Sequence, residues 1–131
     1  MIVVDASVIV AGLADDGPDG DRARDRLRGE DLVAPHLIDL EVVSAWRRSA
    51  AKGDLDERRF QLALHDLVDI PLHRIPHWPL LARCWQLRES LSTYDAVYVA
   101  VAESLGLTLL TADVRLGRSP GTTCQIEVLA S

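Results

Sequence analysis

The sequence is short of basic residues, and this shortage excludes proteins that coat nucleic acid through bulk positive charge. Fourteen basic residues face twenty acidic ones, so the net charge is −6. A protein that binds a duplex by neutralising many phosphates is normally basic. If this protein acts on nucleic acid, a local feature must attract the phosphates.

Cysteines and long apolar runs are also scarce. Only Cys84 and Cys124 occur, far apart and without a C-x-x-C pair, so neither a disulfide scaffold nor a zinc knuckle is predicted. The longest early apolar run, residues 6–14, is much shorter than the roughly 20 residues that cross a bilayer. No basic residue precedes it, as one would in a secretory signal. We therefore expect a cytoplasmic protein without a membrane-spanning segment.

Short β-runs alternate with helical segments along the whole chain. The expected strands are 2–5, 32–34, 72–75, 108–111 and 125–129, and the expected helices are 7–14, 19–28, 35–51, 54–70, 77–90, 94–105 and 113–116. Parallel strands need crossover connections, which helices provide, so this order predicts an α/β fold. We expect residues 1–131 to form one domain, with a central, mainly parallel sheet of about five short strands covered by helices on both faces.

Two acidic residues stand at or just beyond the carboxyl ends of expected strands. Asp5 ends the first apolar run, and Asp113 follows the run 108–111. The carboxyl ends of parallel strands border the ligand crevice of such folds, so both carboxylates are expected at that edge. Each could instead serve only as the cap of the helix that follows, a common use of Asp.

Two further acids lie at helix positions that need an explanation. Glu41 is in the middle of a helix, on a largely apolar face, and a buried carboxylate without a partner costs several kcal/mol or becomes protonated. An ion pair with Arg47 or Arg48 is the structural alternative. Asp95 opens the most hydrophobic helix of the chain, where Thr93 is the expected cap. A negative charge at the second helical position also suits the helix dipole, which is the structural alternative for Asp95.

We call these residues the four acids: Asp5, Glu41, Asp95 and Asp113. Asp5 and Asp113 end strands and Asp95 starts a helix, and such positions meet at one edge of a parallel sheet. Glu41 could reach the same crevice from a neighbouring helix, so the four acids are predicted to converge. Like charges this close raise one another's pKa, and hard cations with oxygen ligands, such as Mg²⁺ or Mn²⁺, relieve the repulsion. A bound cation would also attract phosphate to a protein whose net charge is negative.

Four segments, in order over nearly the whole chain, carry the four acids within longer motifs. They are Val-Asp-Ala-Ser-Val-Ile-Val at 4–10, Pro-x-x-x-x-x-Glu-Val at 35–42, Tyr-Asp-Ala-x-Tyr-Val-Ala-x-Ala-Glu at 94–103 and Leu-Leu-Thr-Ala-Asp at 109–113. Together they resemble the PIN-domain ribonucleases, and most closely the VapC-type toxins of bacterial toxin–antitoxin pairs. The resemblance implies a PIN-like three-layer α/β/α fold. It also implies a Mg²⁺- or Mn²⁺-dependent endoribonuclease that acts as a toxin and inhibits translation and growth.

The resemblance also assigns residues to the site. It implies that the catalytic residues and metal ligands are Asp5, Glu41, Asp95 and Asp113. Ser7 and Thr111 match hydroxyl-bearing neighbours of these acids and are expected to orient them, with ordinary capping as the alternative. Some relatives carry another acid where residues 114–117 are non-acidic, which leaves open whether one or two metal ions bind. Arg115 and Arg118 instead place positive charge there, for contact with substrate phosphate or simply as surface residues.

Partners follow from the same resemblance. It implies an RNA substrate, a small VapB-like antitoxin whose tail covers the acidic site, and a homodimer. The three tryptophans, Trp46, Trp78 and Trp85, are expected mainly in the core, with interface contacts as the alternative. A catalytically weak PIN fold that only binds RNA or protein is the alternative function. A phosphoacceptor receiver domain is disfavoured, because it needs a lysine after a late strand and the chain's one lysine is Lys52.

Overall fold

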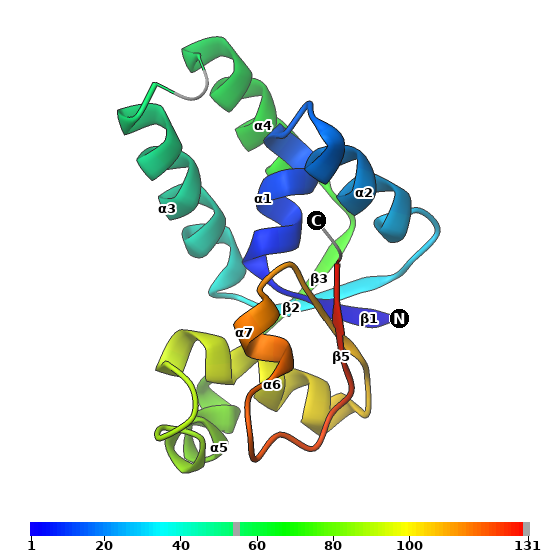
Figure 1. The fold of residues 1–131 in the computed structure, drawn as a ribbon, viewed down its shortest axis with the longest axis vertical. Helices are drawn as coiled ribbons and strands as arrows, with labels where there is room; N and C mark the ends of the chain where they lie inside the picture. The colour runs from blue at the N-terminus through cyan, green and yellow to red at the C-terminus, as the bar shows by residue number, and fades with distance from the viewer. Residues whose placement is uncertain (54–55, 130–131) are drawn as a thin grey trace.

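A computed structural model of the chain, which describes residues 1–53 and 56–129, contains a five-stranded parallel sheet between helices (Figure 1). The strand order is β3-β2-β1-β4-β5, and every neighbouring pair is parallel. The strands are β1 (Ile2–Val4), β2 (Leu32–Pro35), β3 (Leu72–Ile75), β4 (Leu109–Thr111) and β5 (Ile126–Val128). The first strand is therefore central, and the predicted α/β fold is confirmed.

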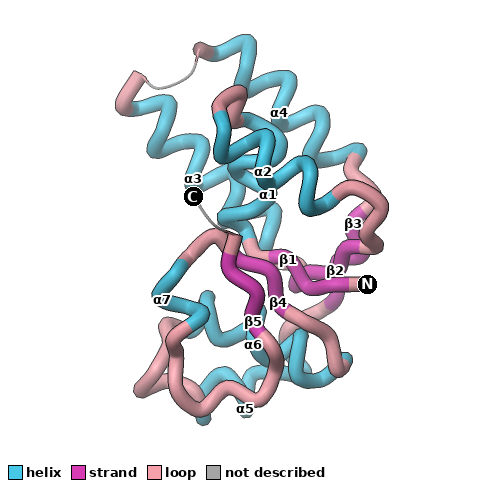
Figure 2. Tube along the Cα trace, turned by 45° about the vertical axis from the view of Figure 1, so that its right-hand side comes forward, coloured by secondary structure: helices cyan, strands magenta, loops and turns pink. Residues whose placement is uncertain are grey.

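Helices cover both faces of this sheet, as the tube view makes plain (Figure 2). The helices are α1 (Ala6–Ala14), α2 (Pro18–Leu27), α3 (Ile38–Ala51), α4 (Glu57–Asp69), the 3-10 turn η1 (Trp78–Leu80), α5 (Leu81–Gln86), α6 (Thr93–Leu105) and α7 (Val114–Gly117). On one side α1 packs against α2, α3 and α4, and on the other α6 packs against β1, β2, β4 and α5. Among the described residues, no helix combines the length and apolarity needed to cross a bilayer.

The core is formed by apolar strands and by the buried helix α6. Val3 and Val4 of β1 have no exposed surface, and residues 96–102 of α6 are all buried. A helix that is apolar nearly all round must be enclosed on every side, and α6 is enclosed by the sheet and α5. It ends at Gly106, whose φ of 66° gives the left-handed cap conformation that glycine adopts without steric cost.

Some helix boundaries differ from the prediction. Pro35 belongs to β2 and pairs with Ile75, so its predicted place in the first turn of a helix is wrong, and α3 begins at Ile38. The strand continues because the carbonyl of Ile75 still accepts a hydrogen bond from the next residue, His36. The predicted helix 54–70 starts at residues that lie outside the described part of the chain, and α4 is described from Glu57, with Asp56 as its cap. The predicted helix 77–90 is a 3-10 turn followed by α5, and residues 87–90 form turns.

Glu103 near the end of α6 joins three parts of the chain. Its carboxylate accepts hydrogen bonds from the Arg83 guanidinium of α5, at 2.7 and 3.0 Å. It also accepts from the backbone N–H and the hydroxyl of Thr123, at 2.7 and 2.8 Å, in the loop before β5. The Arg83 guanidinium, followed by the Thr123 donors, lowers the pKa of Glu103 from 4.5 to about 2.

A Glu103→Gln variant is expected to lower the free energy of unfolding by about 2 kcal/mol at pH 7. Because the folded-state pKa lies below that of the unfolded chain, the unfolded state takes up the proton first as pH falls. The contribution of Glu103 is therefore complete above pH 4.5 and is lost between pH 4.5 and about pH 2. Urea unfolding at several pH values measures the difference, which should close at the acidic end. The exposed Glu89 provides the control, and an equal loss in Glu89→Gln would contradict the assignment.

Candidate active site

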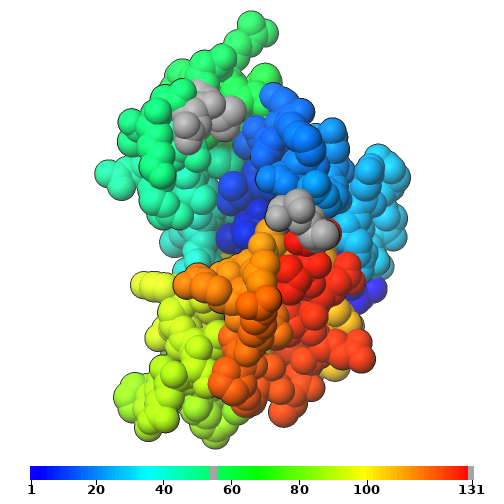
Figure 3. All heavy atoms as spheres, viewed as in Figure 1, coloured from blue at the N-terminus to red at the C-terminus, as the bar shows by residue number. Residues whose placement is uncertain are grey.

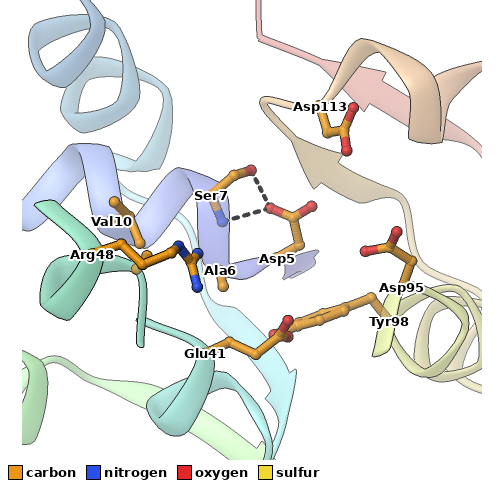
Figure 4. Close-up of a pocket in the computed structure, with 10 residues that line it drawn as sticks. Asp5, Ala6, Ser7, Val10, Glu41, Arg48, Asp95, Tyr98 and Asp113 are labelled. Atoms are coloured by element: carbon orange, nitrogen blue, oxygen red, sulfur yellow. Dashed lines mark hydrogen bonds between the residues drawn. The ribbon is translucent and has the colours of Figure 1, made fainter. Parts of the chain in front are cut away.

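The four acids line one pocket of about 400 Å³ at the carboxyl edge of the sheet (Figure 4). Two of them follow β1 and β4, which are neighbours in the sheet, and the other two come from α3 and α6. In Figure 3 the dark blue start of α1 lies recessed between the green surface of α3 and the orange surface of α7. The structure thus brings together all four residues that the sequence singled out. We refer to this site as the acidic pocket.

Asp5 is both a helix cap and a pocket residue, with only 7% of its surface exposed. Its Oδ1 accepts hydrogen bonds from the backbone N–H of Ser7, at 3.0 Å, and from the Ser7 hydroxyl. Its Oδ2 accepts one from the Thr111 hydroxyl at 2.5 Å. Burial raises the pKa of Asp5, the hydrogen bonds from Ser7 and Thr111 oppose this, and the charge of Asp95 adds to it. Asp5 therefore does cap α1, but its buried carboxylate still faces the negative charge of Asp95.

Two hydroxyls connect Asp5 to the segment that carries Asp113. The Ser7 hydroxyl oxygen accepts a hydrogen bond from the backbone N–H of Ala112 at 3.0 Å. The Thr111 hydroxyl oxygen accepts one from the backbone N–H of Asp113, also at 3.0 Å. Each hydroxyl donates to Asp5 while it accepts from the chain after β4. These bonds fix the position of the Asp5 carboxylate relative to the end of β4.

Glu41 on α3 is half-buried and accepts a hydrogen bond from the Tyr98 hydroxyl of α6 at 2.6 Å. Burial raises the pKa of Glu41, the Tyr98 bond lowers it, and the charges of Asp95 and Asp5 raise it again. The sequence suggested an arginine of the same helix as the structural partner and missed Tyr98. A signal was present, because Tyr98 lies one helical turn after Asp95 and so faces the same side of α6.

A Tyr98→Phe variant is expected to lower the free energy of unfolding by about 1 to 2 kcal/mol, because the Glu41 carboxylate loses its donor. Chemical unfolding at pH 7 measures the loss. The chain's other tyrosine, Tyr94, is 60% exposed on the same helix and offers a matched control. Tyr94→Phe should change stability by less than about 0.5 kcal/mol. Equal losses in the two variants would contradict a stabilising role for the Tyr98 bond.

Asp95 and Asp113 complete the acidic pocket. Ser92, rather than the predicted Thr93, caps α6: its hydroxyl oxygen accepts from the Asp95 N–H at 3.1 Å, which puts Asp95 at the third helical position. The Asp95 carboxylate points toward Asp5 (Figure 4). Asp113 caps α7 by accepting from the Arg115 N–H at 2.9 Å, and it also pairs with the Arg115 guanidinium at 3.0 Å. That guanidinium lowers the pKa of Asp113.

The arginine that lines the acidic pocket is Arg48, and the sequence had suggested Arg115 and Arg118 for phosphate contact instead. Arg115 is bonded to Asp113 with its side chain 88% exposed, and Arg118 lies exposed at the end of α7. Neither lines the pocket, whereas Arg48 of α3 does. The sequence contained a signal for Arg48, because it follows Glu41 by two helical turns and so shares its face.

Asp39 and the tryptophans lie away from the acidic pocket. Asp39 on α3 forms a two-pronged ion pair with Arg74 of β3, at 2.7 and 2.9 Å. Trp46 packs in the core as predicted, with 3% of its surface exposed. Trp78 and Trp85 are 72% and 67% exposed, so their predicted core positions are wrong. The helix α5 turns Cys84 toward the core, and Leu87, just after its end, is buried as well, which leaves Trp85 at the surface.

The donors of the acidic pocket determine which cation suits it. The four acids supply only oxygen, the ligand type that Mg²⁺ and Mn²⁺ prefer. The pKa values of Asp5 and Glu41 are raised by burial and by repulsion among the acids, and a cation would relieve that repulsion. Within residues 1–53 and 56–129, no group of three or more His, Cys, Asp or Glu side chains is arranged to hold a metal ion. The donor set fits such a cation in kind, without a preformed coordination shell.

Comparisons with known proteins match nearly the whole chain. A family model described as PIN domain matches residues 2–121. Ribonuclease VapC9 of Mycobacterium tuberculosis is 41% identical over 98% of this chain and 98% of its own length. Ribonuclease VapC1 of the same organism is 40% identical over 97% of this chain and 96% of its own. A chain in a solved toxin-antitoxin complex from Klebsiella pneumoniae has a similar fold, with a TM-score of 0.68, 18% identity, and coverage of 100% of this chain and 99% of that one.

Proposed function

The chain belongs to the PIN-domain family, and from this premise we propose that it is a Mg²⁺- or Mn²⁺-dependent endoribonuclease of the VapC kind. The observation that carries the proposal is the acidic pocket, in which four separate segments of the chain each contribute one carboxylate. Relatives with about 40% identity over nearly the full length carry the name ribonuclease, which supports RNA as the substrate.

The four acids are the proposed ligands of one or two divalent cations. Such a cation, when bound, lowers the pKa of a water molecule and polarises the phosphodiester that is hydrolysed. The chain's own contribution is to hold the carboxylates in place. Ser7 and Thr111 orient Asp5, and Tyr98 orients Glu41, through the hydrogen bonds described above.

Arg115 and Arg118 are proposed to contact phosphates of the RNA beside the acidic pocket. Arg118 lies exposed at the end of α7 and, among the residues the structure describes, has no carboxylate within 4.0 Å. Arg115 is bonded to Asp113, so it would reach a phosphate only by sharing or exchanging that partner. A planar guanidinium suits both the carboxylate and the phosphate.

The proposed biological role is that of a toxin which inhibits translation and growth by cutting RNA. A VapB-like antitoxin would restrain it by covering the acidic pocket with its tail. The proposed assembly is a homodimer, for which the exposed apolar side chains on α3, η1 and α5 offer surface to bury. The most exposed of them are Leu40, Trp78, Leu81 and Trp85.

Sequencing of RNA ends after brief expression in cells tests the proposed function and identifies the substrate. Wild-type protein should create new ends at defined positions, and Asp95→Asn should create none. Identical RNA ends with and without the wild-type protein would favour the catalytically weak binding module instead.

A further inference from the structure

Among the residues that the structure describes, Arg48 is the one basic residue that lines the acidic pocket. It stands two helical turns after Glu41 on α3, so the two side chains leave the same face, with the small Ala45 between them in the pocket wall. Long side chains on a helix lean toward its N-terminus. In Figure 4 the Arg48 guanidinium extends from α3 toward Ala6, on the α3 side of the acidic pocket.

The Arg48 guanidinium keeps most of its hydrogen-bonding capacity for a ligand. Its Nη1 donates to the Ser44 hydroxyl at 3.1 Å, whereas a guanidinium has five N–H donors in all. Within residues 1–53 and 56–129 it has no carboxylate within 4.0 Å, while eight other arginines are held in ion pairs. Arg48 is therefore an exposed cation beside four carboxylates, and none of the four forms an ion pair with it.

The position of Arg48 in the pocket wall is not explained by a need to balance the charge of Glu41. Tyr98 is the group that hydrogen-bonds to Glu41, and Arg48 acts on that carboxylate only through space. A direct ion pair would hold the guanidinium against a carboxylate, as the Asp39 pair holds Arg74 through two hydrogen bonds.

We propose that Arg48 positions the RNA by donating paired hydrogen bonds to a backbone phosphate on the α3 side of the acidic pocket. This inference rests on the proposed function and names a substrate contact for it. A polyanion that approaches four carboxylates meets repulsion, and the positive charge of Arg48 in the pocket wall offsets part of it. The planar fork of arginine matches two phosphate oxygens, which a lysine ammonium does not.

RNA binding without cleavage provides the first test. A labelled single-stranded RNA of mixed sequence is titrated with Ca²⁺ in place of Mg²⁺, at several salt concentrations, and its integrity is checked on a gel. Arg48→Gln should bind about tenfold more weakly, and its salt dependence should be shallower by about 0.7 in log–log slope, the value for one phosphate contact on a single strand. Arg48→Lys should restore the slope without the full affinity, because it keeps the charge and loses the fork.

The adjacent Arg47 is exposed, does not line the pocket and supplies the matched control. Arg47→Gln should leave both affinity and slope nearly unchanged. Equal affinity and slope in Arg48→Gln and wild type would overturn the inference, as would an equal loss in Arg47→Gln.

Steady-state cleavage of the same RNA with Mg²⁺ separates this inference from the proposed function. Arg48→Gln should raise KM about tenfold while kcat changes by less than about threefold, as expected when a substrate contact is lost in ground and transition states alike. A wild type that does not cleave RNA overturns the proposed function and this inference with it. A wild type that cleaves, with an unchanged KM in Arg48→Gln, overturns this inference alone.

Discussion

An Asp5→Asn variant is expected to lose at least about a thousandfold in metal-dependent RNA cleavage while it stays folded. Asparagine keeps an oxygen that can accept the Ser7 N–H, so the start of α1 remains capped. It removes a charge whose burial is unfavourable, as the raised pKa of Asp5 indicates, so the melting temperature should be maintained or increased. Cleavage of labelled RNA with Mg²⁺ or Mn²⁺, and thermal unfolding followed by circular dichroism, measure the two effects.

Asp39→Asn is the matched control for this variant. Asp39 lies on α3 close to Glu41 in sequence, but it pairs with Arg74 outside the acidic pocket. Loss of this partly exposed ion pair should lower the free energy of unfolding by about 1 kcal/mol while cleavage is retained. Asp5→Asn should thus lose cleavage and keep its stability, whereas Asp39→Asn should keep cleavage and lose some stability. Full cleavage activity in Asp5→Asn would show that the proposed site is wrong.

Removal of divalent cations is expected to have an equally large effect. EDTA should stop RNA cleavage, and added Mg²⁺ or Mn²⁺ should restore it, because the acidic pocket offers only oxygen ligands. A zinc-selective chelator should leave activity unchanged, since no Cys or His from the described part of the chain lines the pocket and zinc sites usually include them. Cleavage that persists in EDTA would point to another mechanism or to a contaminating nuclease. Asp95→Asn protein purified in the same way distinguishes these two explanations, because a contaminant would still cut.

The positions of Asp5 and Asp113 were predictable because they depend on local rules. Each follows a short apolar run, and the ends of parallel strands share one edge of the sheet. The same rule brings the first turn of α6 to that edge, and with it Asp95. The predicted place of Glu41 in the middle of a helix is wrong: α3 begins only at Ile38, so Glu41 lies in its first turn and reaches the same edge. The strand order places β1 at the centre of the sheet, directly beside β4, so the ends of these two strands are neighbours.

Other features depend on packing between segments far apart in the sequence. The Tyr98–Glu41 hydrogen bond joins helices from opposite layers, and no local pattern specifies how closely those layers approach. The exposure of Trp85 depends on which side of α5 faces α6, and so short a helix has little periodicity to reveal it. Pro35 resembles a helix start locally, but pairing with β3 keeps it in a strand.

Binding of Mn²⁺ tests most directly whether the four acids act together as a metal site. Electron paramagnetic resonance can follow a Mn²⁺ titration of the wild type, Asp95→Asn and the Asp39→Asn control without any RNA present. We expect the wild type and Asp39→Asn to bind with similar affinity, and Asp95→Asn to bind at least about tenfold more weakly with an unchanged fold. Equal Mn²⁺ affinity in the wild type and Asp95→Asn would contradict the proposed metal site.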